Sequence, residues 1–369
     1  MRRVTIVSVL IAALSGCVSV RPGPGGALSW SSLPGWNEAG LASAWPALLN
    51  TCTKLGAANS SWQPLCSDAN SQPPPDDAGA RVFFERWFEP HRQRAGVFSG
   101  SGLITGYYEP LLQGSWVRSE RYRFPIYRAP DDLLSIELGS IYPELKGKRV
   151  RGRLDGRRVV PYFSRAEIDH ARVPLAGNEL LWVDDPVALF FLHVQGSGRV
   201  RLDSGETLAV GYAQQNGYPY TAIGRTLIER AGFDPEQIDL PTIRAWLAQH
   251  PNEAQSLMNS NASYVFFALR DASLSGPIGS LGVPLLARRA IAVDPAYIPL
   301  GTPVWLDTDL PGDGAPYRQL VFAQDTGGAI KGPLRADLFF GNDSIAEDYA
   351  GRMKQRGRMY VLLPALPPR

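Results

Sequence analysis

The sequence predicts a mainly β protein that also contains several helices. From Leu103 onward, short apolar runs alternate with turn residues, and this spacing is typical of a β-sandwich or a small barrel. The same pattern returns after Ser263 and continues almost to the end of the chain. Helix start signals interrupt both stretches, and a length of 369 residues is enough for two domains.

The predicted strands fall into two groups. The first group comprises residues 103–108, 122–127, 158–162, 188–195, 199–202 and 206–212. The second group comprises residues 263–269, 289–293, 302–306, 318–323 and 359–363. Composition and periodicity alone establish no strand order, and the sequence contains no recognisable internal repeat.

The predicted helices are recognised by an apolar face or by their end signals. Residues 41–49 and 78–88 precede the strands, and the second of these segments places its aromatic residues on one face. Ser164 to Glu167 forms a capping box that opens a short helix. Further helices are expected at residues 221–230 and 241–250, and from Ser344 onward.

The N-terminus has the pattern of a targeting signal. Arg2 and Arg3 precede an apolar run, residues 4–14, that is too short to span a bilayer. The run leads into Leu-Ser-Gly-Cys, which resembles a bacterial lipobox, so residues 1–17 are expected to be a lipoprotein signal with lipidation at Cys17. The alternative is a plain signal peptide with an incidental cysteine. The residue after the cysteine is not Asp, which favours an outer membrane lipoprotein facing the periplasm of a Gram-negative bacterium.

Beyond the signal, the chain is expected to begin with a flexible tether and to carry no net charge. Residues 18–36 are rich in Pro, Gly and Ser, as in a linker. Loss of Arg2 and Arg3 with the signal reduces 37 basic residues to 35, which equals the 35 acidic residues. A neutral chain gives no support for nucleic-acid binding, which needs a basic face.

The two remaining cysteines, Cys52 and Cys66, predict a disulfide because they form an even pair in an exported chain. Two buried free thiols are the alternative. No histidine lies near them in the sequence, and the four histidines of the chain show no metal-ligand spacing. No metal site is therefore predicted.

Residues 321–341 contain the strongest candidate site. A short apolar run ends at Asp325, three glycines follow within seven residues, and Asp337 then precedes Leu-Phe-Phe. Glycine lets the backbone approach a ligand closely, and an apolar setting raises the pKa of a carboxyl group. A simple turn is the alternative for the Asp-Thr-Gly-Gly segment.

Further motifs precede this stretch in a defined order. They are ITGYYEP at 104–110, HVQGSG at 193–198, and VDP at 293–295 with IPLG at 298–301. Together with AQDTGGAIKG and ADLFFG they resemble the membrane-bound lytic murein transglycosylase A family, over residues 98–363. The resemblance implies a double-psi β-barrel domain, a second β-barrel-like domain inserted into it, and a groove between them. It implies these bounds: residues 37–107 and 246–369 for the barrel domain, and residues 108–245 for the insert.

The same resemblance implies a chemistry. Such an enzyme cuts the β-1,4 bond between N-acetylmuramic acid and N-acetylglucosamine without water and forms 1,6-anhydro-N-acetylmuramic acid. Asp337 matches the catalytic position and is expected to act as general acid and then as base, without a cofactor. Asp325 is expected to support it, whereas Asp294 is expected to be structural.

Peptidoglycan glycan strands are the implied partner, and other cell-wall enzymes are further candidates. Glycan binding needs aromatic platforms and polar side chains. The expected contacts are Thr105, Tyr107, Tyr108, Gln195, Ser197, Asn216, Tyr218, Ser263, Tyr264, Thr326, Gly327 and Phe339. Packing or turn formation is the alternative for each of them.

Two other functions remain open from the sequence. A hydrolytic muramidase would use Asp325 and Asp337 as its two carboxylates. A wall-binding lipoprotein would hold glycan in the groove without cutting it.

Overall fold

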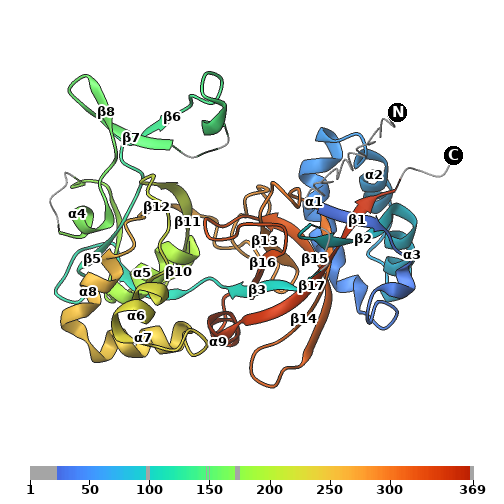
Figure 1. Cartoon of the computed structure of the whole chain (residues 1–369). Helices are drawn as coiled ribbons and strands as arrows, with labels where there is room; N and C mark the ends of the chain where they lie inside the picture. Colours follow the sequence, from blue (N-terminus) through green and yellow to red (C-terminus); the bar gives the residue numbers. More distant parts are fainter. Residues whose placement is uncertain (1–22, 97–99, 147, 149, 171–174, 366–369) are drawn as a thin grey trace, which may run out of the picture.

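The computed structural model describes residues 23–96, 100–146, 148, 150–170 and 175–365. Two bodies lie side by side in Figure 1, a barrel with N-terminal helices and a second domain that contains its own sheet. The predicted signal segment and Cys17 lie outside the described residues. No helix within the described part of the chain is both long enough and apolar enough to cross a membrane.

The barrel is built from six strands. They are β3 (Gly102–Tyr107), β13 (Ala290–Val293), β14 (Pro303–Asp309), β15 (Pro316–Asp325), β16 (Arg335–Phe339) and β17 (Lys354–Pro364). The sheet closes because β17 pairs with both β14 and β3, and the order between them is β14-β15-β13-β16-β3. The predicted mainly β fold with helices is thereby confirmed, whereas the double-psi connection stays a prediction.

The two faces of β15 show why this strand is a continuous apolar run. Val321 and Ala323 point into the barrel core, whereas Leu320 and Phe322 pack against the N-terminal helices. Successive side chains of a strand point to opposite faces, so a strand between two apolar layers must be apolar at every position. The run ends at Asp325, where the strand reaches the edge of the barrel.

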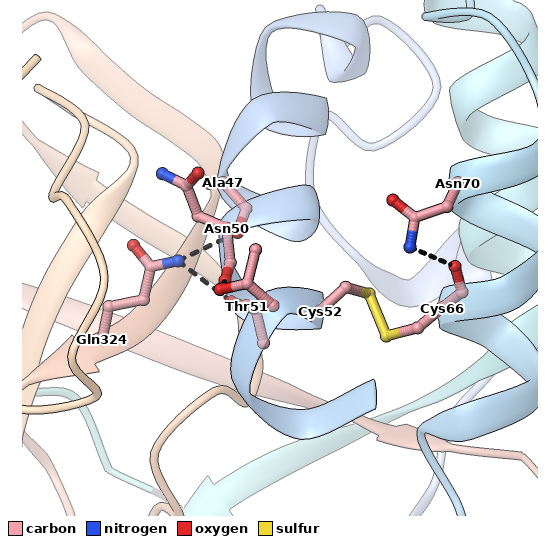
Figure 2. The surroundings of a disulfide bond; sticks show 8 residues. Ala47, Asn50, Thr51, Cys52, Cys66, Asn70 and Gln324 are labelled. Carbon is pink, nitrogen blue, oxygen red and sulfur yellow. Dashed lines mark hydrogen bonds between the residues drawn. A yellow bond between two sulfur atoms is a disulfide. The ribbon is translucent and has the colours of Figure 1, made fainter. Parts of the chain in front are cut away.

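Three helices and two strands cover one side of the barrel. They are α1 (Trp45–Ala58), α2 (Gln63–Ser71), α3 (Asp77–Trp87), β1 (Gly23–Ala27) and β2 (Phe88–Arg94). The structure joins Cys52 of α1 to Cys66 of α2 by a disulfide, shown in Figure 2. A further helix, α9 (Ser344–Arg352), packs against β3 and buries Ala346 and Ala350 in the barrel core.

The prediction of a flexible tether through residue 36 is wrong for its described part. β1 pairs with β2 in an antiparallel ladder, and Trp36 is only 1% exposed. The Trp36 ring meets Trp305 edge-on at 5.1 Å, and its Nε1 donates to Glu85 at 2.8 Å. The Pro and Gly content suggested a linker, but burial of the large aromatic ring holds this segment on the barrel domain.

The second domain contains a six-stranded sheet. In spatial order its strands are β12 (Val265–Arg270), β11 (Thr207–Gln215), β10 (Ser197–Leu202), β4 (Leu111–Ser115), β9 (Glu179–Val183) and β5 (Phe124–Tyr127). The expected barrel-like closure of this domain stays a prediction. A small sheet of β6 (Leu134–Ile136), β7 (Val150–Asp155) and β8 (Arg158–Val160) projects from it in Figure 1.

The inserted domain extends beyond the predicted boundary at residue 245. β12 pairs with β11 from Val265 to Arg270, so it belongs to the inserted sheet. The helices of this domain also share one apolar cluster that includes Leu257 and Met258. These helices are α4 (Arg165–Asp169), α5 (Pro186–Gln195), α6 (Ile223–Ala231), α7 (Leu240–Gln249) and α8 (Pro251–Asn259), of which the last four contribute to the cluster.

The prediction of a strand at residues 188–195 is also wrong, because this segment forms α5. The Asp185 side chain accepts hydrogen bonds from Val187 N and Ala188 N, and Gly196 ends the helix with a φ of 79°. A short apolar run fits a buried helix as well as a buried strand. The N-cap and the terminal glycine were the signals that favoured the helix.

Candidate active site in the cleft between the domains

A cleft of about 820 Å³ separates the barrel from the inserted domain. The barrel contributes Tyr107, Asp325 and Asp337 to its walls. The inserted domain contributes polar residues from the end of α5, from β10 and from the segment that follows β11, among them Gln195, Ser197 and Tyr220. Acidic side chains therefore face hydrogen-bonding side chains across one space.

Asp337 projects from β16 into this cleft. Its neighbours Ala336 and Leu338 belong to the barrel core, so alternation along the strand turns the carboxyl group outward. The Thr105 hydroxyl donates to Asp337 Oδ1 at 2.5 Å, and Arg335 Nη2 donates to the same hydroxyl at 2.7 Å. Thr105 thus links the carboxyl group to a guanidinium group.

The pKa of Asp337 is raised above its ordinary value because burial disfavours the charged form. The positive charge of Arg335 and the bond from Thr105 oppose this increase, whereas the negative charge of Asp325 adds to it. The group is therefore able to hold a proton at a higher pH than an exposed aspartic acid. A proton donor needs this property.

Asp325 lies at the end of β15, and Ser280 and Tyr107 donate hydrogen bonds to its carboxyl group. Ser280 N and Ser280 Oγ each donate to Oδ1 at 2.9 Å, and the Tyr107 hydroxyl donates to Oδ2 at 3.1 Å. Burial raises the pKa of Asp325, and the backbone N–H of Thr326 together with the bonds from Ser280 and Tyr107 partly offsets the increase. Burial and the two aspartates raise the pKa of Tyr107 well above its ordinary value, so the tyrosine stays a donor. This set of donors fits a carboxylate held in its ionised form.

Asp294 accepts a hydrogen bond from the backbone of the glycine-rich loop that follows Asp325. Its Oδ2 accepts from Gly332 N at 2.8 Å, and its Oδ1 accepts from Ala296 N at 3.2 Å. Gly332 has a φ of 97°, a conformation that residues with a side chain rarely adopt. These contacts support the expected structural role of Asp294.

The structure brings half of the twelve expected glycan contacts to the cleft. Thr105 is not among the residues that line the cleft, but its hydroxyl donates to Asp337, which is. The expected residues that line the cleft together with Asp325 and Asp337 are Tyr107, Gln195, Ser197, Ser263, Thr326 and Gly327.

Three of the expected contacts are packing residues instead. Tyr108 is 2% exposed, and its hydroxyl donates to Glu347 at 3.0 Å. Tyr264 is buried between the His193 ring and the Arg165 guanidinium group. Phe339 is buried against the Tyr107 ring at a centroid distance of 5.2 Å.

Asn216 and Tyr218 also differ from the expectation. The buried Asn216 amide donates to Phe163 O at 2.8 Å and to Ala262 O at 2.9 Å, and its oxygen accepts from Tyr264 N. It therefore ties three segments of the inserted domain together. Tyr218 is partly exposed but is not among the residues that line the cleft.

Sequence reasoning missed several residues of the site. Arg335 could have been found, because it lies two positions before Asp337 and therefore on the same face of β16. Ser280 and Tyr220 lie far from both aspartates in the sequence and belong to no motif that marks them. Only the folded chain shows that they line the cleft.

A buried ion pair connects the two chain segments that run between the domains, one after β3 and one after β12. Glu109 follows β3, is 3% exposed and lies 3.5 Å from Arg199 Nε of β10. Arg199 also donates to Ala272 O and Leu274 O on the returning segment, both at 3.3 Å. Burial raises the pKa of Glu109, and the charge of Arg199 opposes the increase. Glu109 and Arg199 therefore join the segment after β3 to the segment after β12, in the wall of the cleft.

Known proteins are similar to this chain in both sequence and architecture. Residues 103–268 match the MltA specific insert domain, and residues 289–363 match the 3D domain. Membrane-bound lytic murein transglycosylase A of Escherichia coli strain K12 is 32% identical over 273 residues, which cover 72% of this chain and 67% of that protein. The insert match ends close to the last residue of β12, in agreement with the boundary seen in the structure.

Solved structures agree over nearly the whole length. The crystal structure of a membrane-bound lytic murein transglycosylase from Agrobacterium tumefaciens has a TM-score of 0.82 and 32% identity, and the match covers 94% of this chain and 98% of that chain. The lytic transglycosylase LtgG of Burkholderia pseudomallei has a TM-score of 0.62 and 41% identity, with coverage of 95% and 97%. The class that these relatives define is the murein lytic transglycosylases. Within it, the chain belongs to the membrane-bound lytic murein transglycosylase A family.

Proposed function

We propose that the protein cleaves the β-1,4 bond between N-acetylmuramic acid and N-acetylglucosamine of peptidoglycan without water. The product end is 1,6-anhydro-N-acetylmuramic acid. The observation that carries the proposal is the outward-facing carboxyl group of Asp337, whose pKa is raised by burial beside a cleft that spans both domains. Membership of the transglycosylase family supports the choice of substrate.

In this mechanism Asp337 acts twice. It first gives its proton to the glycosidic oxygen, which leaves with the N-acetylglucosamine. The C6 hydroxyl oxygen of the same N-acetylmuramic acid then bonds to the anomeric carbon, and its proton passes to the Asp337 carboxylate. The acid is thereby restored, and neither a cofactor nor a second catalytic carboxylate is required.

An internal hydroxyl can replace water because it is already positioned. Intramolecular reactions reach effective molarities of about 10⁵–10⁸ M, far above the concentration of water. The rings of Tyr107 and Tyr220 line the cleft and would help to exclude bulk solvent from the bound sugar.

Asp325 has a supporting role in this proposal. Ser280 and Tyr107 donate three hydrogen bonds that favour its ionised form. A negative charge in the cleft would stabilise the positive charge that develops on the sugar ring in the transition state. Its negative charge also raises the pKa of Asp337, which keeps the acid protonated.

Substitution of each aspartate by asparagine tests this division of roles. Asp337→Asn retains the size of the side chain but removes the transferable proton, so it should abolish turnover while glycan still binds. Asp325→Asn should reduce the rate less. Release of muropeptides from purified sacculi gives the rates, and glycan co-sedimentation gives binding. Equal and complete loss in both variants would favour the muramidase, and full activity of Asp337→Asn would refute the site.

We also propose that the chain is an outer membrane lipoprotein anchored through Cys17. The support is the lipobox pattern of residues 14–17, together with the "membrane-bound" names of the relatives. Labelling with a fatty acid in a Gram-negative host should modify the native chain and leave Cys17→Ala unlabelled. Label on the variant would contradict the assignment.

A further inference from the structure

Gln324 is a fully buried residue of β15 whose side-chain amide faces α1. Its side chain is 0% exposed, and the next residue in β15 is Asp325. Gln324 Nε2 donates to Ala47 O and to Thr51 Oγ1 of α1, both at 2.9 Å (Figure 2). A carbonyl oxygen only accepts, so the Ala47 contact fixes which end of the amide faces the helix.

The backbone of Gln324 holds the loop that carries Ser280. Its carbonyl oxygen accepts from Leu281 N at 3.0 Å. Leu281 follows Ser280, whose backbone N–H and hydroxyl both donate to Asp325 Oδ1. Gln324 therefore contacts α1 with its side chain. Its main chain contacts the loop that contains Ser280 and Leu281, here called the donor loop.

The helix holds the same loop at a second point. Asn50 Nδ2 of α1 donates to Pro284 O at 3.0 Å, a few residues beyond Ser280. Residue 52 of the same helix is tied to α2 by the disulfide with Cys66, as Figure 2 shows. The donor loop is thus supported through Gln324 and Asn50 by a helix that is itself covalently tied down.

We propose that Gln324 is a positioning residue, which uses α1 as a rigid support to hold Ser280 and Asp325 in the geometry that the reaction needs. The inference rests on the proposed function, in which Asp325 acts as a carboxylate. Without the two bonds from Gln324 Nε2 to α1, the end of β15 and the donor loop are free to shift. Ser280 would then donate to Asp325 less well.

The test compares Gln324→Met, which keeps the volume but loses both bonds, with Thr51→Val, which removes one acceptor from α1. Loss of a buried hydrogen-bonded contact of this kind should lower kcat about tenfold in Gln324→Met. KM should change little, because Gln324 does not touch the cleft. The double variant should be no slower than Gln324→Met alone, since both changes break the same contact.

The matched control is Thr308→Val, which removes a buried hydroxyl bond to Arg356 O of 3.0 Å elsewhere in the barrel. This control should lower the melting temperature but leave kcat unchanged. If Gln324→Met is destabilised and yet has the native kcat, the positioning role is refuted. If Gln324→Met does not fold, Thr51→Val decides the question: it breaks one of the two bonds and should lower kcat about threefold, and a native kcat in that variant overturns the proposal.

The pH profile gives a readout that general destabilisation would not change. Asp325 faces Tyr107 of β3 and Asp337 of β16, and the backbone N–H of Thr326 together with the donors of Ser280 and Tyr107 offsets the effect of burial on its pKa. Weaker donation raises the pKa of Asp325, so activity should be lost at a higher pH on acidification in Gln324→Met but not in Thr308→Val. An active Asp337→Asn would refute the proposed function instead. An inactive Asp337→Asn beside a fully active Gln324→Met would refute only the positioning role.

Discussion

The hydrogen bond between Tyr107 and Asp325 offers a defined perturbation of the site. Tyr107→Phe removes the hydroxyl that donates to Asp325 Oδ2 and keeps the ring that packs on Phe339. No other donor to Oδ2 is found among the described side chains. The substitution therefore removes one interaction without opening a large cavity.

The structure sets the expected size of the effect. A hydrogen bond to a charged group contributes about 1.5–3 kcal/mol. The distance of 3.1 Å is long for a hydroxyl donor, which places this bond near the lower end. Tyr107 is only 9% exposed, so solvent replaces the lost bond poorly. A loss of about 1.5 kcal/mol of transition-state stabilisation corresponds to a kcat that is roughly tenfold lower.

The pH dependence should change in a defined direction. Burial already raises the pKa of Asp325, and the bond from Tyr107 opposes the increase. Without that bond the pKa of Asp325 rises further, so on acidification the ionised form is lost at a higher pH. The acid limb of the kcat profile should therefore move to higher pH, whereas a loss of stability alone would leave it in place.

The assay is the rate of muropeptide release from purified sacculi, measured across pH. Tyr162→Phe is the matched control, because Tyr162 is a buried tyrosine whose hydroxyl donates to Asp132 at 2.9 Å in the inserted domain, and it does not line the cleft. The control should keep the native kcat and the native acid limb. An unchanged acid limb in Tyr107→Phe, or an equal shift in both variants, would refute the supporting role of an ionised Asp325.

Two further predictions concern stability. Trp36→Ala should lower the free energy of unfolding by about 3–5 kcal/mol, the usual cost of removing a buried tryptophan. Urea unfolding measures this, and a native midpoint would show that residues 23–36 do not contribute to the fold. Thiol titration of the denatured, unreduced protein should find neither Cys52 nor Cys66 free, and replacing both should cost about 3 kcal/mol for a loop of this length. If both Cys52 and Cys66 react under those conditions, the disulfide is contradicted.

The barrel strands could be predicted because local patterns determine them. The runs at 289–293, 302–306 and 318–323 overlap β13, β14 and β15, since strands buried in the barrel are apolar along their length. The same rule failed for α5, whose apolar residues serve a helix buried on most sides. The Pro and Gly content before Trp36 was misleading for another reason, because its effect depends on a ring buried by distant residues.

The site could be predicted only where a motif contains it. Asp325 and Asp337 belong to one stretch of sequence, and the structure places both in the cleft. Phe339 belongs to the same stretch and Tyr108 to the motif at 104–110, but packing buries both rings, Tyr108 in the barrel core and Phe339 against Tyr107. Ser280 donates to Asp325 across 45 positions of sequence, a contact that depends on the loop conformation and leaves no local pattern.

The chemical form of the product tests the central claim most directly. Purified sacculi are digested with the full-length protein, and the muropeptides are separated and weighed before and after borohydride treatment. The proposed mechanism predicts 1,6-anhydro-N-acetylmuramic acid ends, which are lighter than reducing ends by one water and resist borohydride. Asp337→Asn should release neither kind of end. Reducible N-acetylmuramic acid ends as the main product of the native protein would contradict the transglycosylase mechanism and establish a hydrolase.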